Sequence, residues 1–373
     1  MFQDLTVLHV VGARPNFMKV APVLRALEGR GGFRNVLVHT GQHYDAAMSQ
    51  AFFDDLGIPE PDEHLEVGSG SHARQTAGVL AGMERVLVDR RPDLVMVVGD
   101  VNSTLAGALA AAKLHIPVAH LEAGLRSRDR RMPEEINRLL TDQLADLCLT
   151  PSRDGDANLL AEGIAPERIR FVGNVMIDTL ERMLPAARAR TPEAGEGLPE
   201  GGYVVVTLHR PSNVDDAATL TGIFHALEEI AVDVPVLFPM HPRTRKQADA
   251  FHLRLEGVRV VEPLGYLDML ALQARAGLVL TDSGGMQEET TVLGVPCLTL
   301  RDSTERPVTV TEGTNRLVRD RSTASILEAF RTSWGKAPPG MRPEGWDGRA
   351  AERVADALEA WGGRVPAGAG ARG

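Results

Sequence analysis

The sequence predicts an α/β protein with two doubly wound parallel sheets, one in each half of the chain. Short apolar runs that suit buried parallel strands alternate with helix-forming segments, and the connections between them are short. One arrangement occurs twice, over residues 93–122 and 278–302: a buried strand ending near an aspartate, a helix, a proline, and a second strand ending near an acidic residue. A chain of 373 residues with 43% hydrophobic content can bury two cores.

In the first half, an apolar strand over residues 5–11 opens through Gly12 into a helix that reaches about residue 27. The following strands are predicted at residues 36–40, 93–98 and 116–121. An alanine-rich helix to about residue 115 separates the last two, and Pro133 opens another helix.

A segment rich in proline, glycine, alanine and charge, residues 185–202, is interpreted as a linker. Strands of the second half are predicted at residues 203–208, 236–238, 258–261, 278–280 and 297–300. A helix over residues 351–361 precedes a Gly/Ala-rich tail that we expect to be disordered. These limits predict an N-terminal domain over residues 1–180, a C-terminal domain over residues 200–350, and a terminal helix and tail over residues 351–373.

The composition of the chain limits which binding partners and which cellular compartment we expect. The net charge of −10 argues against nucleic acid or an anionic membrane as the main partner, so an anionic ligand needs a local binding cluster. Cys148 and Cys297 lie in apolar strand-like surroundings, which suits a reducing cytoplasm and argues against disulfides or a cysteine metal site. The sequence shows no secretory leader and no apolar run of membrane-spanning length, so we expect a cytoplasmic protein.

The glycine spacing of residues 68–73 superficially matches a dinucleotide-binding turn. The segment before it is too charged for the buried strand that such a turn requires. We interpret these residues as a loop that caps a helix, which leaves an NAD-dependent oxidoreductase with little support.

The stretch from Thr281 to Glu289 is the strongest candidate site. Ser283, Gly284 and Gly285 lie where a predicted strand becomes a helix. Glycines let a ligand approach the backbone, and the free amides and dipole of a helix start favour an anion. The pattern predicts a phosphate site, with Glu289 placed further along the helix to accept hydrogen bonds from a ribose diol. The alternative is a tight turn in an ordinary strand-helix unit.

A second anion site is predicted where the first strand opens into its helix, because Arg14 and Lys19 lie at the end where the helix dipole disfavours cations. Other reactive side chains also follow predicted strands, and ligands of doubly wound sheets bind at the carboxyl ends of the strands. Two such sheets facing a cleft would bind a sugar nucleotide. Its diphosphate would lie at Ser283 to Gly285, and its sugar among Asp100, Glu122, Glu134 and His209.

Each of these four side chains also has a purely structural explanation. Asp100 could cap a helix, Glu122 could pair with Arg126, Glu134 is a common first-turn acid, and His209 could be a strand-end hydrogen-bonding residue. A shared site accounts for all four together.

Taken together, these motifs resemble the non-hydrolysing UDP-N-acetylglucosamine 2-epimerases, from about residue 5 to about residue 320. The residues that carry the resemblance are Gly12-Ala13-Arg14-Pro15 with Lys19, Gly99-Asp100, His120 to Arg126, Pro133 to Arg138, Gly173-Asn174, His209-Arg210 and Thr281 to Glu289. The resemblance implies two Rossmann-like domains facing a cleft, as in the glycosyltransferase-B fold. It also implies conversion of UDP-N-acetylglucosamine to UDP-N-acetylmannosamine through loss and return of UDP, without a cofactor or metal.

The resemblance assigns roles by motif position. Asp100, Glu122 and Glu134 would be the acid/base carboxylates, and His209 would aid departure or return of the diphosphate. The substrate contacts would be Arg14, Lys19, Arg138, Arg210, Ser283, Gly284, Gly285 and Glu289. The family is often dimeric and can use a second UDP-N-acetylglucosamine as activator, for which Gln42 and His241 resemble binding residues.

Several alternatives remain open. Relatives that act on UDP-2,3-diacetamido-glucuronate share most of these motifs, and Arg126 and Arg128 could then meet a sugar carboxylate. A glycosyltransferase of the same architecture, a hydrolysing 2-epimerase and a non-enzymatic nucleotide-sugar sensor are the other candidates. The sequence shows no basic or apolar acceptor patch of the kind that many glycosyltransferases carry.

Overall fold

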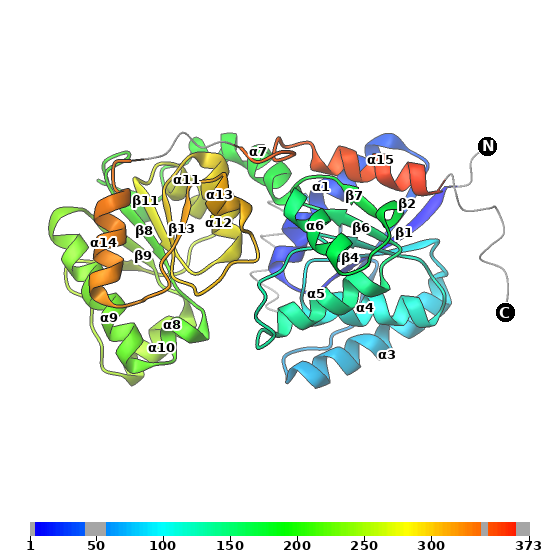
Figure 1. The fold of residues 1–373 in the computed structure, drawn as a ribbon, viewed down its shortest axis with the longest axis horizontal. Helices are drawn as coiled ribbons and strands as arrows, with labels where there is room; N and C mark the ends of the chain where they lie inside the picture. The colour runs from blue at the N-terminus through cyan, green and yellow to red at the C-terminus, as the bar shows by residue number, and fades with distance from the viewer. Residues whose placement is uncertain (1–3, 42–56, 337–341, 363–373) are drawn as a thin grey trace. The chain divides into compact units, whose positions relative to one another are not determined.

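The computed structural model describes residues 4–41, 57–336 and 342–362, and the chain divides into two compact units (Figure 1). The first unit contains Met1–Thr179 together with Glu344–Gly373, and the second contains Leu180–Pro343. Each unit is built around one parallel sheet, as the repeated strand-helix pattern predicted.

The sheet of the first unit has the strand order β3-β2-β1-β4-β5-β6-β7, and its strand pairs are parallel. The strands are β1 (Leu5–Val11), β2 (Phe33–His39), β3 (Glu63–His64), β4 (Leu94–Val98), β5 (Val118–Leu121), β6 (Leu147–Thr150) and β7 (Ile169–Phe171). The strand order reverses between β1 and β4, and such a reversal opens a crevice beyond the carboxyl ends of the strands. The doubly wound prediction is confirmed here.

Helices cover the first sheet, and their apolar residues form its core with fully buried strand residues such as Leu8 and Val97. The helices are α1 (Arg14–Arg30), α3 (His72–Arg90), α4 (Asn102–Lys113), α5 (Pro133–Leu144), α6 (Arg153–Ala161) and α15 (Ala350–Gly362), with a short 3₁₀ turn over Pro166–Arg168. Helix α7 (Val175–Arg188) begins in the first unit and ends in the second. Ser71 caps α3, because its hydroxyl accepts from the Arg74 amide, so the loop over residues 68–73 has the helix-capping role predicted for it.

The C-terminal helix α15 is part of the first unit. It packs beside α1 (Figure 1), and Arg30 of α1 forms ion pairs with Asp356 and Glu359. At its start, the Asp178 carboxylate accepts hydrogen bonds from the Ala350 and Ala351 amides at 3.0 and 2.7 Å. The domain boundaries predicted from the sequence set residues 351–373 apart from the first domain. The contacts of α15 with α1 and Asp178 join residues far apart in the chain, and such contacts leave no local signal in the sequence.

The second sheet has the order β10-β9-β8-β11-β12-β13, also with parallel pairs and a reversal between β8 and β11. Its strands are β8 (Val204–Thr207), β9 (Val236–Pro239), β10 (Arg259–Val261), β11 (Leu278–Thr281), β12 (Cys297–Thr299) and β13 (Asn315–Leu317). Its helices are α8 (Pro211–Val214), α9 (Ala217–Asp233), α10 (Pro242–Ala250), α11 (Tyr266–Ala274), α12 (Gly284–Leu293), α13 (Val308–Thr311) and α14 (Thr323–Ser333), with a 3₁₀ turn over Glu193–Gly195.

The segment interpreted as a linker begins later than its composition suggested. Helix α7 continues through Pro185 to Arg188, because Leu180, Met183 and Ala187 are buried at helical spacing. The Arg275 guanidinium then bonds the Arg188 carbonyl at 2.5 Å and covers the end of the helix.

The described ranges hold neither a membrane-spanning helix nor a cluster of metal-binding side chains. None of the helices there combines the length and apolar character needed to cross a bilayer. In the same ranges, histidine, cysteine, aspartate and glutamate side chains do not gather into a group of three or more that could hold a metal ion.

Candidate functional site

The first unit builds a tight turn at its topological switch point. The Asn16 side chain accepts from the amides of Gly12 and Ala13, both at 3.1 Å, and donates to the Val98 carbonyl of β4 at 2.9 Å. A Cβ atom at Gly12 would lie 2.3 Å from the Ser103 hydroxyl, so the turn requires glycine. The side chain of Arg14, predicted to bind substrate here, lies outside the described residues.

Lys19 and Glu122 form a buried ion pair beside this turn, with side chains only 6% and 5% exposed. Glu122 follows β5 with a φ of 76°, a left-handed conformation that costs energy in a residue with a side chain. The structure thus joins two predicted site residues. The alternative in which Glu122 pairs with Arg126 is wrong, because Arg126 is bound by Asp142 and Glu162.

Asp100 and Arg138 form a second pair, with 2.5 Å between Oδ2 and Nη2. Arg138 also contacts Glu135 at 2.8 Å, and Glu135 accepts hydrogen bonds from the amides of Ser127 and Arg128 at 2.9 Å. Burial alone would raise the pKa of Glu135, but these amides and the Arg138 guanidinium outweigh it and lower the pKa. Glu135 therefore holds both Arg138 and the backbone of Ser127 and Arg128 in place.

The structure does not support the helix-capping explanation of Asp100. The residue before α4 is Val101, and within the described residues no side chain caps the start of that helix. The Asp100 carboxylate is instead 22% exposed at the end of β4. Glu134 lies half-buried in the first turn of α5, one turn before Arg138, without a hydrogen bond or ion pair to another described residue.

In the second unit, the buried Asp282 fixes His209. The Asp282 carboxylate accepts from the His209 and Arg210 amides at 3.0 and 2.8 Å, from the Asn213 side chain at 3.1 Å, and from His209 Nδ1 at 2.9 Å. Burial would raise the pKa of Asp282, but the hydrogen bonds and charge of His209 and the two amides lower it. Nδ1 therefore carries a proton, and the side chain, 41% exposed, presents Nε2.

A strand-to-helix turn lies where the phosphate site was predicted. Helix α12 starts at Gly284, immediately after β11, and none of the described side chains caps this start. Ser283, Gly284 and Gly285 are half-exposed, so the first amides of the helix are open to a ligand. A Cβ atom at Gly284 would lie 2.8 Å from Arg306 Nη1, which explains the need for glycine.

A buried cluster of four charges supports the start of α12. Arg306 contacts Glu288 at 2.7 Å and also Glu305, and Glu305 contacts Arg301 at 2.8 Å. All four side chains are at most 7% exposed. The two cations balance the two anions, so the cluster adds no net charge behind the phosphate site.

Glu289 is almost fully buried, at 6% exposure. Burial raises its pKa to about 7, although the polar side chains of Tyr266 and Gln273 of α11 oppose the shift. The carboxyl therefore gains and loses its proton near neutral pH, which the sequence did not indicate.

His241 lies next to His209, with 5.7 Å between ring centroids. Its Nδ1 accepts from the Arg243 amide and caps α10, while burial and the nearby His209 lower its pKa. Gln42, predicted with it in an activator site, lies outside the described residues.

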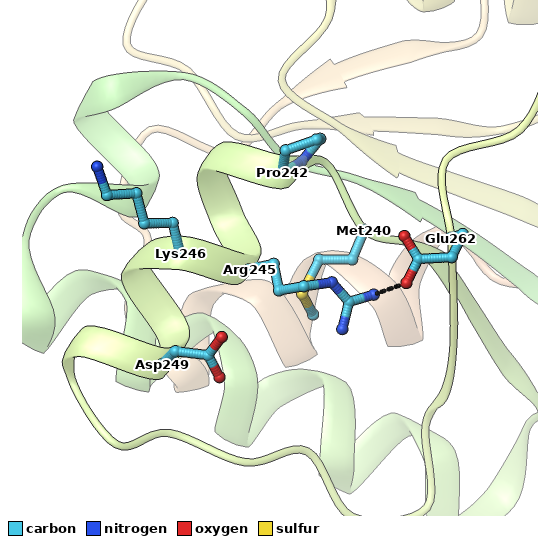
Figure 2. A pocket seen from close by; sticks show the side chains of 6 residues that line it. All are labelled: Met240, Pro242, Arg245, Lys246, Asp249 and Glu262. Carbon is cyan, nitrogen blue, oxygen red and sulfur yellow. Dashed lines mark hydrogen bonds and ion pairs between the residues drawn. The ribbon is translucent and has the colours of Figure 1, made fainter.

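A cavity of about 380 Å³ opens beside α10 (Figure 2). Its lining residues are Met240, Pro242, Arg245, Lys246, Asp249 and Glu262. Arg245 points to Glu262 at 2.9 Å across it (Figure 2). The predicted catalytic and phosphate-binding residues are not among this lining, whereas Met240 and Pro242 flank His241 in the sequence.

Comparison with known proteins identifies the family to which this chain is similar. The family described as UDP-N-acetylglucosamine 2-epimerase matches residues 25–359. The UDP-2,3-diacetamido-2,3-dideoxy-D-glucuronate 2-epimerase of Pseudomonas aeruginosa is 46% identical, covering 95% of this chain and 99% of its own. The UDP-GlcNAc 2-epimerase of Methanocaldococcus jannaschii, solved in complex with UDP-GlcNAc and UDP, has a TM-score of 0.88 at 40% identity, covering 95% of this chain and 100% of its own.

A more distant structure bears on the fold alone. The calicheamicin glycosyltransferase CalG4 has a TM-score of 0.57 at 17% identity, covering 98% of this chain and all of its own. The glycosyltransferase-B-like prediction is confirmed by this likeness together with the two parallel sheets. Because the family match covers most of the chain, and relatives with high identity span nearly their whole length, this chain belongs to the UDP-N-acetylglucosamine 2-epimerase family and is an isomerase.

Proposed function

We propose that this chain interconverts UDP-N-acetylglucosamine and UDP-N-acetylmannosamine by inverting carbon 2 of the sugar. One observation carries the proposal: Asp282, the residue before Ser283, binds His209 beside a helix start that no described side chain caps. A histidine next to free helix amides suits a leaving diphosphate. The carboxylates of the first unit supply the proton chemistry. The Methanocaldococcus jannaschii relative, solved with UDP-GlcNAc and UDP, supports the choice of nucleotide sugar.

The chemistry of carbon 2 determines the route. Its hydrogen is not next to a carbonyl, so direct removal as a proton is very difficult. When the bond between carbon 1 and the UDP oxygen breaks, UDP takes the electron pair and positive charge develops at carbon 1, which acidifies this hydrogen. A carboxylate then takes the proton, and the C–H electron pair forms the double bond of 2-acetamidoglucal.

The return steps invert the centre. A carboxylic acid protonates carbon 2 from the other face, and UDP adds back to carbon 1, so that protons and electrons balance over the cycle. We assign the acid and base roles to Asp100, Glu122 and Glu134, and assistance to the diphosphate to His209. Their placement at strand ends and helix starts supports this assignment.

Substrate binding is assigned with the same reasoning. Ser283, Gly284 and Gly285 would bind the diphosphate, and Glu289 the ribose. Arg14, Lys19, Arg138 and Arg210 would complete the substrate contacts. Because Lys19 and Arg138 are paired with Glu122 and Asp100, we propose that they also hold these carboxylates in position.

A second substrate is favoured by one observation, the 46% identity to the UDP-2,3-diacetamido-2,3-dideoxy-D-glucuronate 2-epimerase of Pseudomonas aeruginosa. This substrate carries an extra carboxylate. Arg126 is not available to bind it, because Asp142 and Glu162 already hold its guanidinium. The exposed Arg128, which donates to Asn158 at 2.6 Å, is the remaining candidate of the two.

Further properties follow the same family pattern. We propose a homodimer that works in the cytoplasm, where UDP-sugars are made and the free cysteines Cys148 and Cys297 stay reduced. A second UDP-N-acetylglucosamine would act as activator near Gln42 and His241. We expect the reaction to need neither a cofactor nor a metal.

Proton NMR in deuterated water tests the proposal directly. Incubation with UDP-N-acetylglucosamine should produce the anomeric signal of UDP-N-acetylmannosamine, with deuterium entering carbon 2 of both sugars. Free N-acetylmannosamine plus UDP would indicate a hydrolysing enzyme instead. If only the diacetamido-glucuronate nucleotide is converted, the second substrate is correct.

Variants test the residue assignment. Asp100→Asn and His209→Ala should abolish turnover and leave UDP binding intact. His225→Ala, an exposed histidine of α9 in the same unit, is the matched control and should keep full activity. Turnover in either of the first two variants would contradict the assignment.

A further inference from the structure

A chain of alternating charges lies behind the carboxyl ends of β4 and β5. It runs from His120 to Asp142, then to Arg126 and finally to Glu162. His120 and Asp142 are fully buried, and the Arg126 side chain is 1% exposed. Only the last member, Glu162, reaches solvent, with 21% exposure. Apart from His120, these residues come from α5, from the loop after β5, and from the end of α6.

The hydrogen bonds of His120 determine its charge. Nδ1 lies 2.6 Å from Asp142 Oδ1, and Nε2 lies 2.8 Å from the carbonyl oxygen of Gly99. A carbonyl oxygen can only accept. Asp142 is likewise an acceptor, because the Arg126 guanidinium lies 2.7 Å from its Oδ2 and the Gly124 amide donates to the same oxygen at 3.1 Å. Both ring nitrogens must therefore donate, which only an imidazolium can do.

The surroundings can hold this buried cation. Asp142 balances His120, and Glu162 balances Arg126, so the chain is neutral as a whole. Two other titratable groups contact the Asp142 carbonyl: Arg168, whose Nη2 donates to it at 3.3 Å, and Cys148 of β6, whose Sγ lies 3.8 Å away. Burial raises the pKa of that thiol to about 12, so it adds no charge.

The two ends of the charged chain hold the two turns that carry the predicted carboxylates. His120 Nε2 binds the carbonyl of Gly99, the residue directly before Asp100. Asp142 Oδ2 accepts from the Gly124 amide at 3.1 Å, two residues after Glu122. His120 itself lies two residues before Glu122. The strained, left-handed backbone of Glu122 is thus held on both sides by one buried carboxylate.

We infer that the His120 imidazolium and the Asp142 carboxylate are positioning residues that set the geometry of both Asp100 and Glu122. Neither group needs to touch substrate. The inference rests on the proposed function in so far as Asp100 and Glu122 exchange protons with the sugar. Misplacing a reacting group by about 1 Å can cost about 100-fold in rate, so loss of this support should appear in kcat.

The protonation state can be measured without any substrate. In protein with ¹⁵N-labelled histidine at neutral pH, His120 should show a bound proton on both ring nitrogens. His9 is the internal comparison: it is equally buried, in β1, and burial lowers its pKa to about 4, so its ring should be neutral. In Asp142→Asn, His120 should lose one ring proton, and the Gly124 amide should exchange faster. A single ring proton on His120 in the wild-type protein would overturn the inference.

Kinetics test the positioning role. His120→Asn keeps a donor for Asp142 but loses the bond to Gly99, whereas His120→Gln keeps a donor for Gly99 but loses Asp142. We expect His120→Asn and Asp142→Asn to lower kcat about 100-fold with KM changed less than about threefold. His120→Gln, which still holds the Asp100 turn, should lose less. His9→Gln is the matched control and should keep the wild-type kcat.

The outcomes separate this inference from the proposed function. Wild-type kcat in both His120→Asn and Asp142→Asn would show that the charged chain does not position the carboxylates. A wild-type protein that converts neither nucleotide sugar would contradict the proposed function. In that case the ring protons of His120 and the exchange rate of the Gly124 amide still decide whether this charged support exists.

Discussion

Glu289 offers the sharpest test of the energetics around the phosphate site. Its carboxyl is buried in the second unit and its pKa is raised to about 7 from an ordinary 4.5. Glu289→Gln replaces it with a neutral side chain of the same shape. The variant removes the cost of burying a charge and keeps a polar group beside Tyr266 and Gln273.

The size of the effect follows from the pKa. Each tenfold change in a proton equilibrium is worth about 1.4 kcal/mol, so ionised Glu289 costs the folded state roughly 3 kcal/mol. Because the folded pKa lies above the unfolded one, this cost is absent below pH 4.5. It grows as the pH rises to about 7 and stays constant above that value. Glu289→Gln should therefore match the wild type in acid and exceed its stability by roughly 3 kcal/mol in mild alkali.

Native-state hydrogen exchange of the α12 amides is a suitable assay, because it reports the opening of the second unit itself. It should be measured from about pH 5 to about pH 8, after correction for the intrinsic exchange rate. Glu328→Gln, an exposed acid on α14 of the same unit, is the matched control and should change stability by less than about 0.5 kcal/mol at each pH. Parallel pH profiles for the wild type and Glu289→Gln would refute the reasoning.

Three more changes probe other parts of the structure. Asp282→Asn places an amide among backbone donors and should destabilise the second unit by about 3 kcal/mol in urea unfolding. Asp302 is an exposed acid, so Asp302→Asn should cost less than about 1 kcal/mol. Gly284→Ala forces a methyl group against Arg306 and should weaken UDP binding, measured by calorimetry, at least about tenfold, with unchanged affinity arguing against an open helix start. Trp346→Ala removes a side chain that is 1% exposed and should destabilise the first unit by about 3–5 kcal/mol in thermal unfolding, while a loss below about 1 kcal/mol would mean that α15 is not anchored there.

Local patterns were enough to predict where the candidate residues lie. A strand that ends in a turn and a helix fixes the position of Ser283 without knowledge of the rest of the chain. Parallel strands place their carboxyl ends on one edge, which brings Asp100 and Glu122 to the same rim. Both inferences need only the order of the elements.

The groups that support those residues could not be predicted in the same way. Asp142 binds His120 from 22 residues away, and Asp282 binds His209 from 73 residues away. Arg126 was expected to face a sugar or Glu122, yet it points inward to Asp142 and Glu162. Each of these partners depends on which faces of a helix and a strand meet in the folded unit, and that choice leaves no periodic signal in the sequence.

The acids around the start of α12 explain how an acidic protein can offer an anion site. Asp282 is buried, and its charge is met by two backbone amides and His209. Glu288 is paired with Arg306 at 2.7 Å. Glu289 can hold its proton up to about pH 7. Each acid is therefore neutralised by a different means, and the open amides of the helix face solvent with little opposing charge. Above pH 7, ionised Glu289 adds a negative charge near these amides unless ribose hydroxyls bind it. Inorganic diphosphate has no ribose, so its affinity should fall with rising pH more steeply in the wild type than in Glu289→Gln.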